Sequence, residues 1–105
     1  MKAILACVDF SRVSRRVVSE AISLARIHGA RLILLHVVQP PGVLADLAPL
    51  AGETMQFTTE IERRAKLHLL RWQRALVRRG VTVETGCKRG NPVPVILAAA
   101  RRIEA

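Results

Sequence analysis

Residues 2–11 read Lys-Ala-Ile-Leu-Ala-Cys-Val-Asp-Phe-Ser, an apolar run that ends in an acid and is followed at once by a helical pattern. This order predicts a strand over residues 2–8, apolar on both faces, that leads through a turn into a helix. In open parallel sheets, ligands bind outside the carboxyl ends of the strands. Asp9, which comes directly after the strand, is therefore the first candidate for contact with a small molecule.

The first helix and the second strand follow this turn. Ser11 or Ser14 can cap the helix, and Gly29 ends it. Residues 31–38, Arg-Leu-Ile-Leu-Leu-His-Val-Val, predict a strand that is buried on both sides. The helix positions predicted to face the core keep a helical period: Val17, Ala21, Leu24, Ala25 and His28.

The rest of the chain repeats this alternation of helix and strand. Gly80 ends the longest predicted helix, and Asn91 followed by Pro92 is typical of a helix start. The predicted elements are a loop over residues 39–53, a helix over 54–79, an edge strand over 81–87 and a helix over 93–103. The apolar stripe predicted for the long helix consists of Phe57, Ile61, Ala65, Leu69, Trp72 and Leu76.

Composition agrees with one α/β domain over residues 1–105. Half of the residues are hydrophobic but only 3% are aromatic, so the core is expected to consist of Val, Leu, Ile and Ala. Such cores are typical of parallel sheets with helices on both faces. No apolar stretch reaches the roughly 18 residues that a membrane span needs. Met1 and Lys2 lead straight into a strand rather than a signal peptide, so we expect a cytoplasmic protein.

The two cysteines do not suggest a metal site or a disulfide framework. Cys7 and Cys87 are too few and too far apart in the sequence for either. If they lie on the first and third strands with the second between them, they are roughly 10 Å apart, beyond disulfide reach. Both are expected to be core thiols.

The charge balance is strongly basic, with 17 Lys and Arg against 8 Asp and Glu and a net charge of +9. Such a charge attracts phosphates, anionic lipids or nucleic acid. Eleven of the basic residues are scattered over two predicted helices, without the interleaved aromatic residues on which bases stack. Solvated helix faces are therefore favoured over a nucleic-acid surface.

The sequence offers little for catalysis, since Ser-His-Asp, HExxH and P-loop patterns are not found in it. Glu60 and Glu62 point to different sides of their predicted helix. His36, inside the second strand, is expected to be a hydrogen-bonded core histidine rather than a metal ligand or a catalytic group. A binding module is therefore favoured over an enzyme.

Three stretches resemble the universal stress protein family: residues 4–11 (Ile-Leu-Ala-Cys-Val-Asp-Phe-Ser), 34–37 (Leu-Leu-His-Val) and 90–92 (Gly-Asn-Pro). They stand in the family's order and at roughly its spacing, and the likeness covers essentially the whole chain. The resemblance implies an adenine nucleotide alpha hydrolase-like, Rossmann-like fold of three layers (α/β/α) with parallel strands in the order 3-2-1-4-5. This chain matches three strands, in the order 3-2-1, and three helices, so we expect the domain to be incomplete at its C-terminus.

The resemblance also implies a site for an adenine nucleotide, ATP or AMP, with Mg²⁺. Asp9 matches the family's acid that contacts the adenosine portion, and Cys7 and Val8 precede it at the end of the strand. Val37 matches the position whose backbone contacts adenine. The stretch G-x2-G-x9-G-S/T, which holds the phosphates in the nucleotide-binding branch of the family, is not found in residues 1–105.

The residues themselves make a more modest case for this site. Backbone N–H groups from Ser11 to Ser14, at the start of the first helix, can accept an anion, and Arg12 adds positive charge. The alternative role of Asp9 is that of a capping or turn residue. A turn role for Gly90 is favoured over direct contact with a ligand.

Association is expected because the first strand, internal in the family's sheet, would become an edge whose only charge is Lys2. We expect a homodimer through this edge or through the helix face left uncovered. The expected function is a stress-response or regulatory domain that binds an adenine nucleotide in its complete form. The alternatives are an interaction module without nucleotide, a basic nucleic-acid-binding domain and a slow nucleotide hydrolase.

Overall fold

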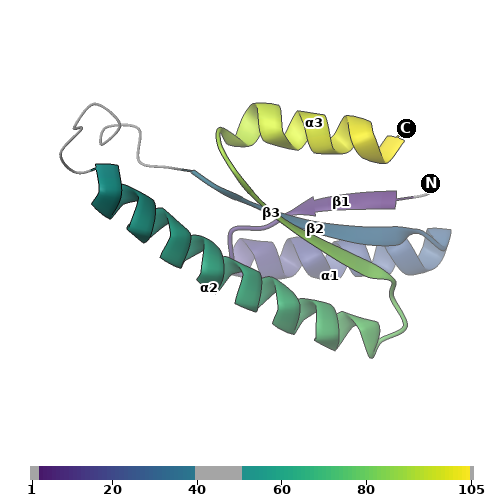
Figure 1. The fold of residues 1–105 in the computed structure, drawn as a ribbon. Coiled ribbons are helices and arrows are strands. Elements are labelled where there is room, and N and C mark those ends of the chain that lie inside the picture. Colours follow the sequence, from purple (N-terminus) through teal and green to yellow (C-terminus); the bar gives the residue numbers. More distant parts are fainter. Residues whose placement is uncertain (1–2, 40–50, 105) are drawn as a thin grey trace.

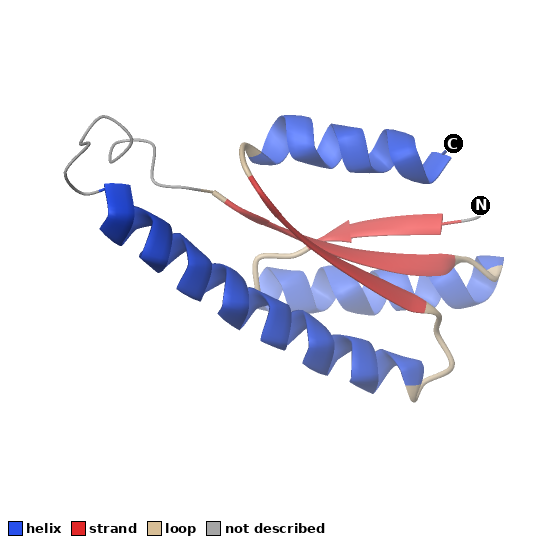
Figure 2. Ribbon diagram, viewed as in Figure 1, coloured by secondary structure: helices blue, strands red, loops and turns tan. Residues whose placement is uncertain are grey.

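The computed structural model describes residues 3–39 and 51–104, and the side chains of residues 51–57 and 104 lie outside that description. Strands and helices alternate along the chain (Figures 1 and 2). The elements are β1 (Ala3–Cys7), α1 (Arg12–His28), β2 (Arg31–Val38), α2 (Ala51–Val77), β3 (Val83–Arg89) and α3 (Pro92–Glu104).

The three strands form one parallel sheet in the order β1-β2-β3. Figure 1 shows α1 and α2 on one side of the sheet and α3 on the other. The α/β class, the helices on both faces and the strand order 3-2-1 are thus confirmed. Neighbouring parallel strands are joined by crossover connections, which here contain α1 and α2. Each of these helices packs back onto the sheet.

The strand register brings the ends of β1 and β2 together. Ala3 pairs with Arg31 and Cys7 with Leu35, and the Val8 N–H donates to the Leu35 carbonyl at 2.9 Å. The residues that follow β1 therefore lie beside the last residues of β2, at the carboxyl edge of the sheet.

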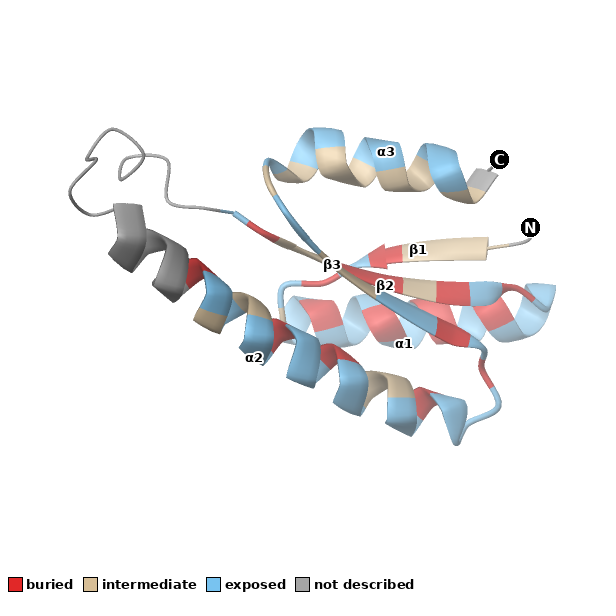
Figure 3. Ribbon diagram, viewed as in Figure 1, coloured by how far each residue is buried: buried red, intermediate tan, exposed pale blue. Residues whose placement is uncertain are grey.

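The core lies between the sheet and the pair α1 and α2. Leu32 and Leu34 are fully buried there, and Leu69 of α2 is 2% exposed. Alternate residues of a strand face opposite sides, so the even-numbered positions of β2 supply this core. On the other side of the sheet, none of the described residues of α3 is buried (Figure 3). Further members of the core cluster are Ala6, Val8, Val18, Ala21, Ile22, Ala25, Leu76, Val81 and Val83.

The predicted helix boundaries agree closely with those observed. The Ser11 hydroxyl accepts from the Ser14 N–H at 3.3 Å, and Gly29 ends α1 with φ 60°, in the left-handed region that favours glycine. The Asn91 side chain accepts from the Val93 N–H at 3.2 Å, so the predicted cap of α3 is confirmed. Gly80, with φ 81°, lies in the turn after α2.

Two boundaries differ from the prediction. The helix predicted from residue 54 begins at Ala51, and residues 40–50 of the predicted loop lie outside the described residues. The strand predicted over residues 81–87 runs from Val83 to Arg89. Lys88 and Arg89, which follow the predicted strand, continue the ladder opposite Val37 and Val38.

Some predictions of burial were wrong. Cys7 is exposed rather than a core thiol, because within the described residues β1 has a strand neighbour on one side alone, and because Cys7 belongs to the odd-numbered set, on the side of α3. Cys87 is only partly buried. Val17 and Leu24 of α1 are 38% and 43% exposed, since the buried stripe of that helix lies on a neighbouring face. The exposed fraction of Ile61 on α2 is 38%, whereas Ala65, Leu69 and Leu76 are buried as expected.

Candidate functional site

The turn between β1 and α1 is closed by hydrogen bonds between Asp9 and two serines. Asp9 Oδ1 accepts from the Ser11 N–H at 2.9 Å and from the Ser14 hydroxyl at 2.6 Å. In return, the Asp9 N–H donates to Ser14 Oγ at 2.8 Å. The structural role weighed for Asp9, that of a turn residue, is therefore present.

These contacts also fix the charge of Asp9. Hydrogen bonds from Ser11 and Ser14 lower the pKa of Asp9 from 3.8 to about 2, so the carboxylate is ionised at neutral pH. The side chain is exposed although Ser14 is buried. Both side-chain bonds end on Oδ1, and Oδ2 accepts no hydrogen bond from any described residue. The turn presents an oriented negative charge with an oxygen available to a ligand.

Phe10 anchors the turn to α2, a contact that was not predicted from the sequence. Its φ of 67° is in the left-handed region, which costs a bulky residue roughly 1–2 kcal/mol. Its ring lies 4.7 Å from the ring of His36, 4.9 Å from that of His68 and 5.7 Å from that of Trp72. Contacts of this kind between aromatic rings offset the backbone strain.

His36 is hydrogen-bonded, as predicted, although it is partly buried rather than fully in the core. Its Nδ1 lies 2.6 Å from the carbonyl oxygen of Val8. Since a carbonyl can only accept, Nδ1 carries the hydrogen and donates it. This bond ties the end of β2 to the residue before Asp9.

A cavity of about 260 Å³ opens beside this turn, at the carboxyl ends of β1 and β2. It brings together the ends of two strands and the starts of α1 and α3, which is where open parallel sheets bind ligands. Its lining is mostly apolar, with Asp9, Ser14 and His36 as polar members. The residues that line it are Cys7, Val8, Asp9, Val13, Ser14, Val17, Leu35, His36, Val37, Pro92 and Ile96.

Four of the six predicted site residues line this cavity: Cys7, Val8, Asp9 and Val37. Ser11 is not among the lining residues but supports Asp9 through its N–H. Gly90 is not among them either, and it acts as a turn residue. Its N–H donates to the Val38 carbonyl at 3.0 Å, and its φ of 139° is one that residues with side chains rarely adopt.

His36, Pro92 and Ile96 also line the cavity and were not predicted as site residues from the sequence. Pro92 and Ile96 come from α3, whose first turn reaches the ends of β1 and β2 only after the chain has crossed the sheet. Pro92 and Ile96 are far from Asp9 in the sequence, so no local pattern links them to it. The change from strand to helix at Gly90 was the one signal that could have placed the start of α3 near this cavity.

The thiol of Cys7 is no activated nucleophile. Although Cys7 is exposed, neighbouring atoms desolvate its thiol in part, which raises its pKa above the ordinary value, so it stays protonated at neutral pH. Among the described residues, no group of three or more His, Cys, Asp or Glu side chains is placed to hold a metal ion.

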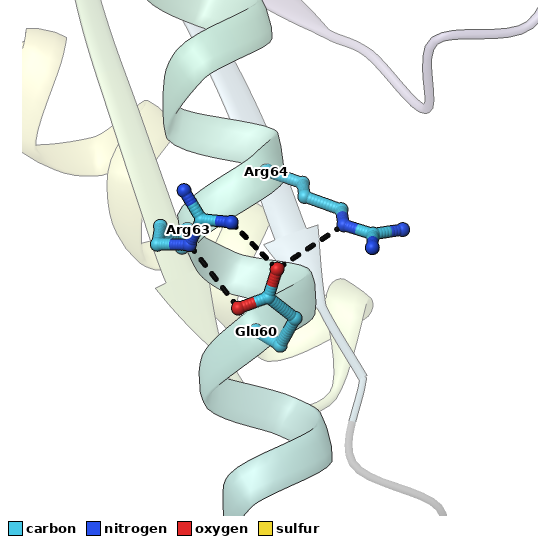
Figure 4. Close-up of polar contacts among 3 residues, drawn as sticks. All are labelled: Glu60, Arg63 and Arg64. Carbon is cyan, nitrogen blue, oxygen red and sulfur yellow. Dashed lines mark hydrogen bonds and ion pairs between the residues drawn. The ribbon is translucent and has the colours of Figure 1, made fainter.

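The basic helix faces are partly neutralised by local pairs. On α2, Glu60 accepts from Arg63 at 2.7 and 3.1 Å and from Arg64 at 3.3 Å (Figure 4). Glu62 pairs with Lys66 at 3.0 Å and also with Arg89 of β3. The Glu60 pairs are largely exposed, as expected of a solvated face, whereas the Glu62 side chain is only 18% exposed. Within the described part of the chain, no helix is long and apolar enough to cross a membrane.

Comparisons with known proteins agree on one group. The model of the universal stress protein family matches residues 1–105. A universal stress protein UspA from Lactobacillus plantarum has a similar structure, with a TM-score of 0.80 and 21% identity, over 98% of this chain and 70% of that one. A protein of the universal stress protein family from Burkholderia pseudomallei gives a TM-score of 0.70 and 26% identity, over 99% and 76%. A search of curated proteins finds no match.

Proposed function

The chain belongs to the universal stress protein family, and on that premise we propose that it binds an adenine nucleotide at the carboxyl ends of β1 and β2. The observation that supports this most is the Asp9 carboxylate, ionised and fixed by Ser11 and Ser14 at the 260 Å³ cavity. A flat, mostly apolar base fits such a lining, and ribose hydroxyls or an exocyclic amino group can donate to Oδ2.

The charge of Asp9 decides which part of the nucleotide it contacts. A carboxylate repels phosphate groups, so the cavity holds the nucleoside portion. The phosphates then lie outside it, toward the first turn of α1, where backbone N–H groups and the exposed Arg12 favour negative charge. In this arrangement the nucleoside portion would make most of the contacts with the described residues, so AMP and adenosine should bind nearly as well as ATP.

The test is a calorimetric titration of the 105-residue chain with Mg-ATP, AMP and adenosine. Saturable binding of all three is expected. Asp9→Asn should weaken each by about tenfold to a hundredfold, because a hydrogen bond to a charged group contributes about 1.5–3 kcal/mol. Asparagine keeps an acceptor for Ser11 and Ser14, so the turn is retained.

The matched control is Glu84→Gln, which removes a carboxylate at the other end of the sheet, where Glu84 pairs with Arg31 at 3.2 Å. This variant should bind as the wild type does. No heat with any of the three ligands, or equal losses in the Asp9 and Glu84 variants, would contradict the proposal.

A second candidate function is an interaction module that associates as a dimer without nucleotide. It is favoured by β1, whose only strand neighbour among the described residues is β2. Sedimentation equilibrium at tens of micromolar, with and without Mg-ATP, separates the two functions. A dimer that binds no nucleotide would favour this candidate, and a monomer that binds nucleotide would exclude it.

A further inference from the structure

A groove of about 240 Å³ lies between α1 and α2. Its lining comes from these helices and from the turn after α2, and no strand residue of the described chain is part of it, so it opens away from the sheet. It shares no residue with the cavity beside Asp9. The last described element, α3, lies on the opposite face of the sheet (Figure 1). The residues that line the groove are Arg15, Val18, Ser19, Ile22, Trp72, Ala75, Leu76 and Arg79.

The spacing of these residues gives the groove the shape of a seat for a helix. On α1 the lining begins at Arg15 and continues three, four and seven positions later, and the same spacing recurs from Trp72 onward. Residues spaced in this way share one face of a helix. Two such ridges side by side leave a channel into which the ridge of a third helix can pack. Each ridge spans two turns, about 10 Å along the helix axis.

The floor of the groove is apolar and recessed. Val18, Ile22 and Leu76 are buried, so their side chains do not project from the surface. Trp72 is partly buried, with its ring edge-on to Phe10 at 5.7 Å. A flat membrane surface does not reach a recessed floor, and the Phe10 contact leaves less of the Trp72 ring for a nucleic-acid base to stack on. Apolar side chains that project from a helix can enter the groove and cover this floor.

The two ends of the groove are cationic. Because α1 and α2 both run back from the carboxyl edge of one parallel sheet, Arg15 near the start of α1 and Arg79 after the end of α2 lie at opposite ends. Both are exposed, and neither forms an ion pair with any described residue. Arg26 adds a third cation near Arg79, whose carbonyl it contacts through Nη2 at 2.5 Å. Guanidinium groups bind carboxylates in a bidentate geometry.

The described acids of the two helices lie away from this groove. Glu20, on α1, borders β1 on the other side of its helix. Glu60 pairs with two arginines of its own helix, and Glu62 pairs with Arg89 of β3. The described chain thus supplies no negative charge to the groove, so the complementary charge has to come from a partner.

We propose that the groove between α1 and α2 is a docking site for an acidic amphipathic helix of a partner protein. Its apolar face covers Ile22 and Trp72, and carboxylates about two turns apart pair with Arg15 and Arg79 at the two ends. The function that this adds is recruitment of a protein partner, at a surface separate from the proposed nucleotide site. Failure of either proposal therefore leaves the other standing.

The test uses the fluorescence of Trp72, the only tryptophan of the chain. The probe is a designed peptide of about 18 residues, long enough to form a helix, with leucines on one face and glutamates beside them. Titration of the 105-residue chain with this peptide should give a saturable blue shift, because the peptide removes water from Trp72. A matched peptide with lysines in place of the glutamates should give none. No saturable shift with the acidic peptide would overturn the proposal.

A pair of variants distinguishes docking in the groove from general attraction to a basic chain. Arg15→Gln combined with Arg79→Gln should weaken peptide binding by about tenfold or more, since two charged contacts are lost. The matched control, Arg101→Gln combined with Arg102→Gln, removes the same charge from exposed positions of α3 on the opposite face and should change binding less than about twofold. Equal weakening in the two variants would overturn the proposal.

The other anionic occupants are tested in the same way. Phosphatidylglycerol vesicles and a single-stranded oligouridylate should shift the Trp72 emission little, and the Arg15 and Arg79 substitutions should not alter their binding more than the control does. If either of them binds more tightly than the acidic peptide and depends on Arg15 and Arg79, the assignment of the groove to a protein helix is wrong.

Discussion

The two faces of the sheet are covered unequally. On the side of α1 and α2, Leu34 is fully buried and Leu69 is 2% exposed, whereas Leu97 of α3, on the other side, is 51% exposed. Apolar burial is the dominant favourable contribution to folding, so the first side stabilises the domain. The start of α3 on the second side contributes instead to the lining of the candidate cavity. Stability and the candidate site thus depend on different faces of one sheet.

The largest effect on stability is expected from a substitution in the core between the sheet and the helices α1 and α2. Leu34→Ala should lower the free energy of unfolding by about 2–5 kcal/mol, because it removes buried methyl groups and leaves a cavity. Leu97→Ala, on α3, should cost less than about 1 kcal/mol, as is usual for an exposed position. Urea unfolding followed by circular dichroism measures both. Similar losses for the two variants would mean that α3 packs as tightly as α1 and α2.

The elements of the fold could be predicted because their signals are local. Helix caps such as Ser11, Gly29 and Asn91 lie next to the segments that they limit, and the buried strands show as apolar runs. The exposure of Cys7 and Val17 could not be predicted in the same way. Their exposure depends on which elements pack beside β1 and α1, and the local sequence of one element does not show which elements pack against it.

The candidate site was predictable in part for a similar reason. Asp9 and Val37 stand at strand ends, and parallel strands place their ends together. The spacing of Asp9, Ser11 and Ser14 was a usable signal for the closed turn. The left-handed backbone of Phe10 could not be predicted from the neighbouring sequence, because the rings that stabilise it belong to β2 and α2, which come later in the chain.

The next largest effect on stability is expected in the turn that precedes α1, and it is compared with the effect in the turn that precedes α3. Ser14→Ala removes two hydrogen bonds and leaves the Asp9 N–H without its partner, so it should cost about 1–3 kcal/mol. Asn91→Ala removes one capping bond at the start of α3 and should cost about 1 kcal/mol. Thermal unfolding at pH 7 would compare them. A greater loss of stability in the Asn91 variant would contradict this order and show that the turn before α3 contributes more to stability.

A smaller effect follows from the charge of Asp9. Its pKa is lowered from 3.8 to about 2 in the folded chain, so ionised Asp9 stabilises the fold above about pH 4. That contribution is lost as the pH falls from about 4 to about 2, where the folded chain also takes up the proton. Stability should therefore fall less steeply in this window for Asp9→Asn than for the wild type. Asn91→Ala should keep the slope of the wild type, since no charge is removed, and equal slopes in all three proteins would contradict the assignment.

The smallest effect is expected on the outward surface of α2. Glu60 holds Arg63 and Arg64 in a geometry that suggests strength, but all three side chains are 44% or more exposed. Solvent screening and the entropy lost in fixing two long side chains leave such pairs with little net effect. Glu60→Gln should therefore leave the urea midpoint unchanged within error, at low salt and at 1 M NaCl, whereas Leu69→Ala on the inward surface of the same helix should lower it strongly. A loss for Glu60→Gln that disappears at high salt would show that the ion pairs, and not the buried stripe alone, hold α2 against the sheet.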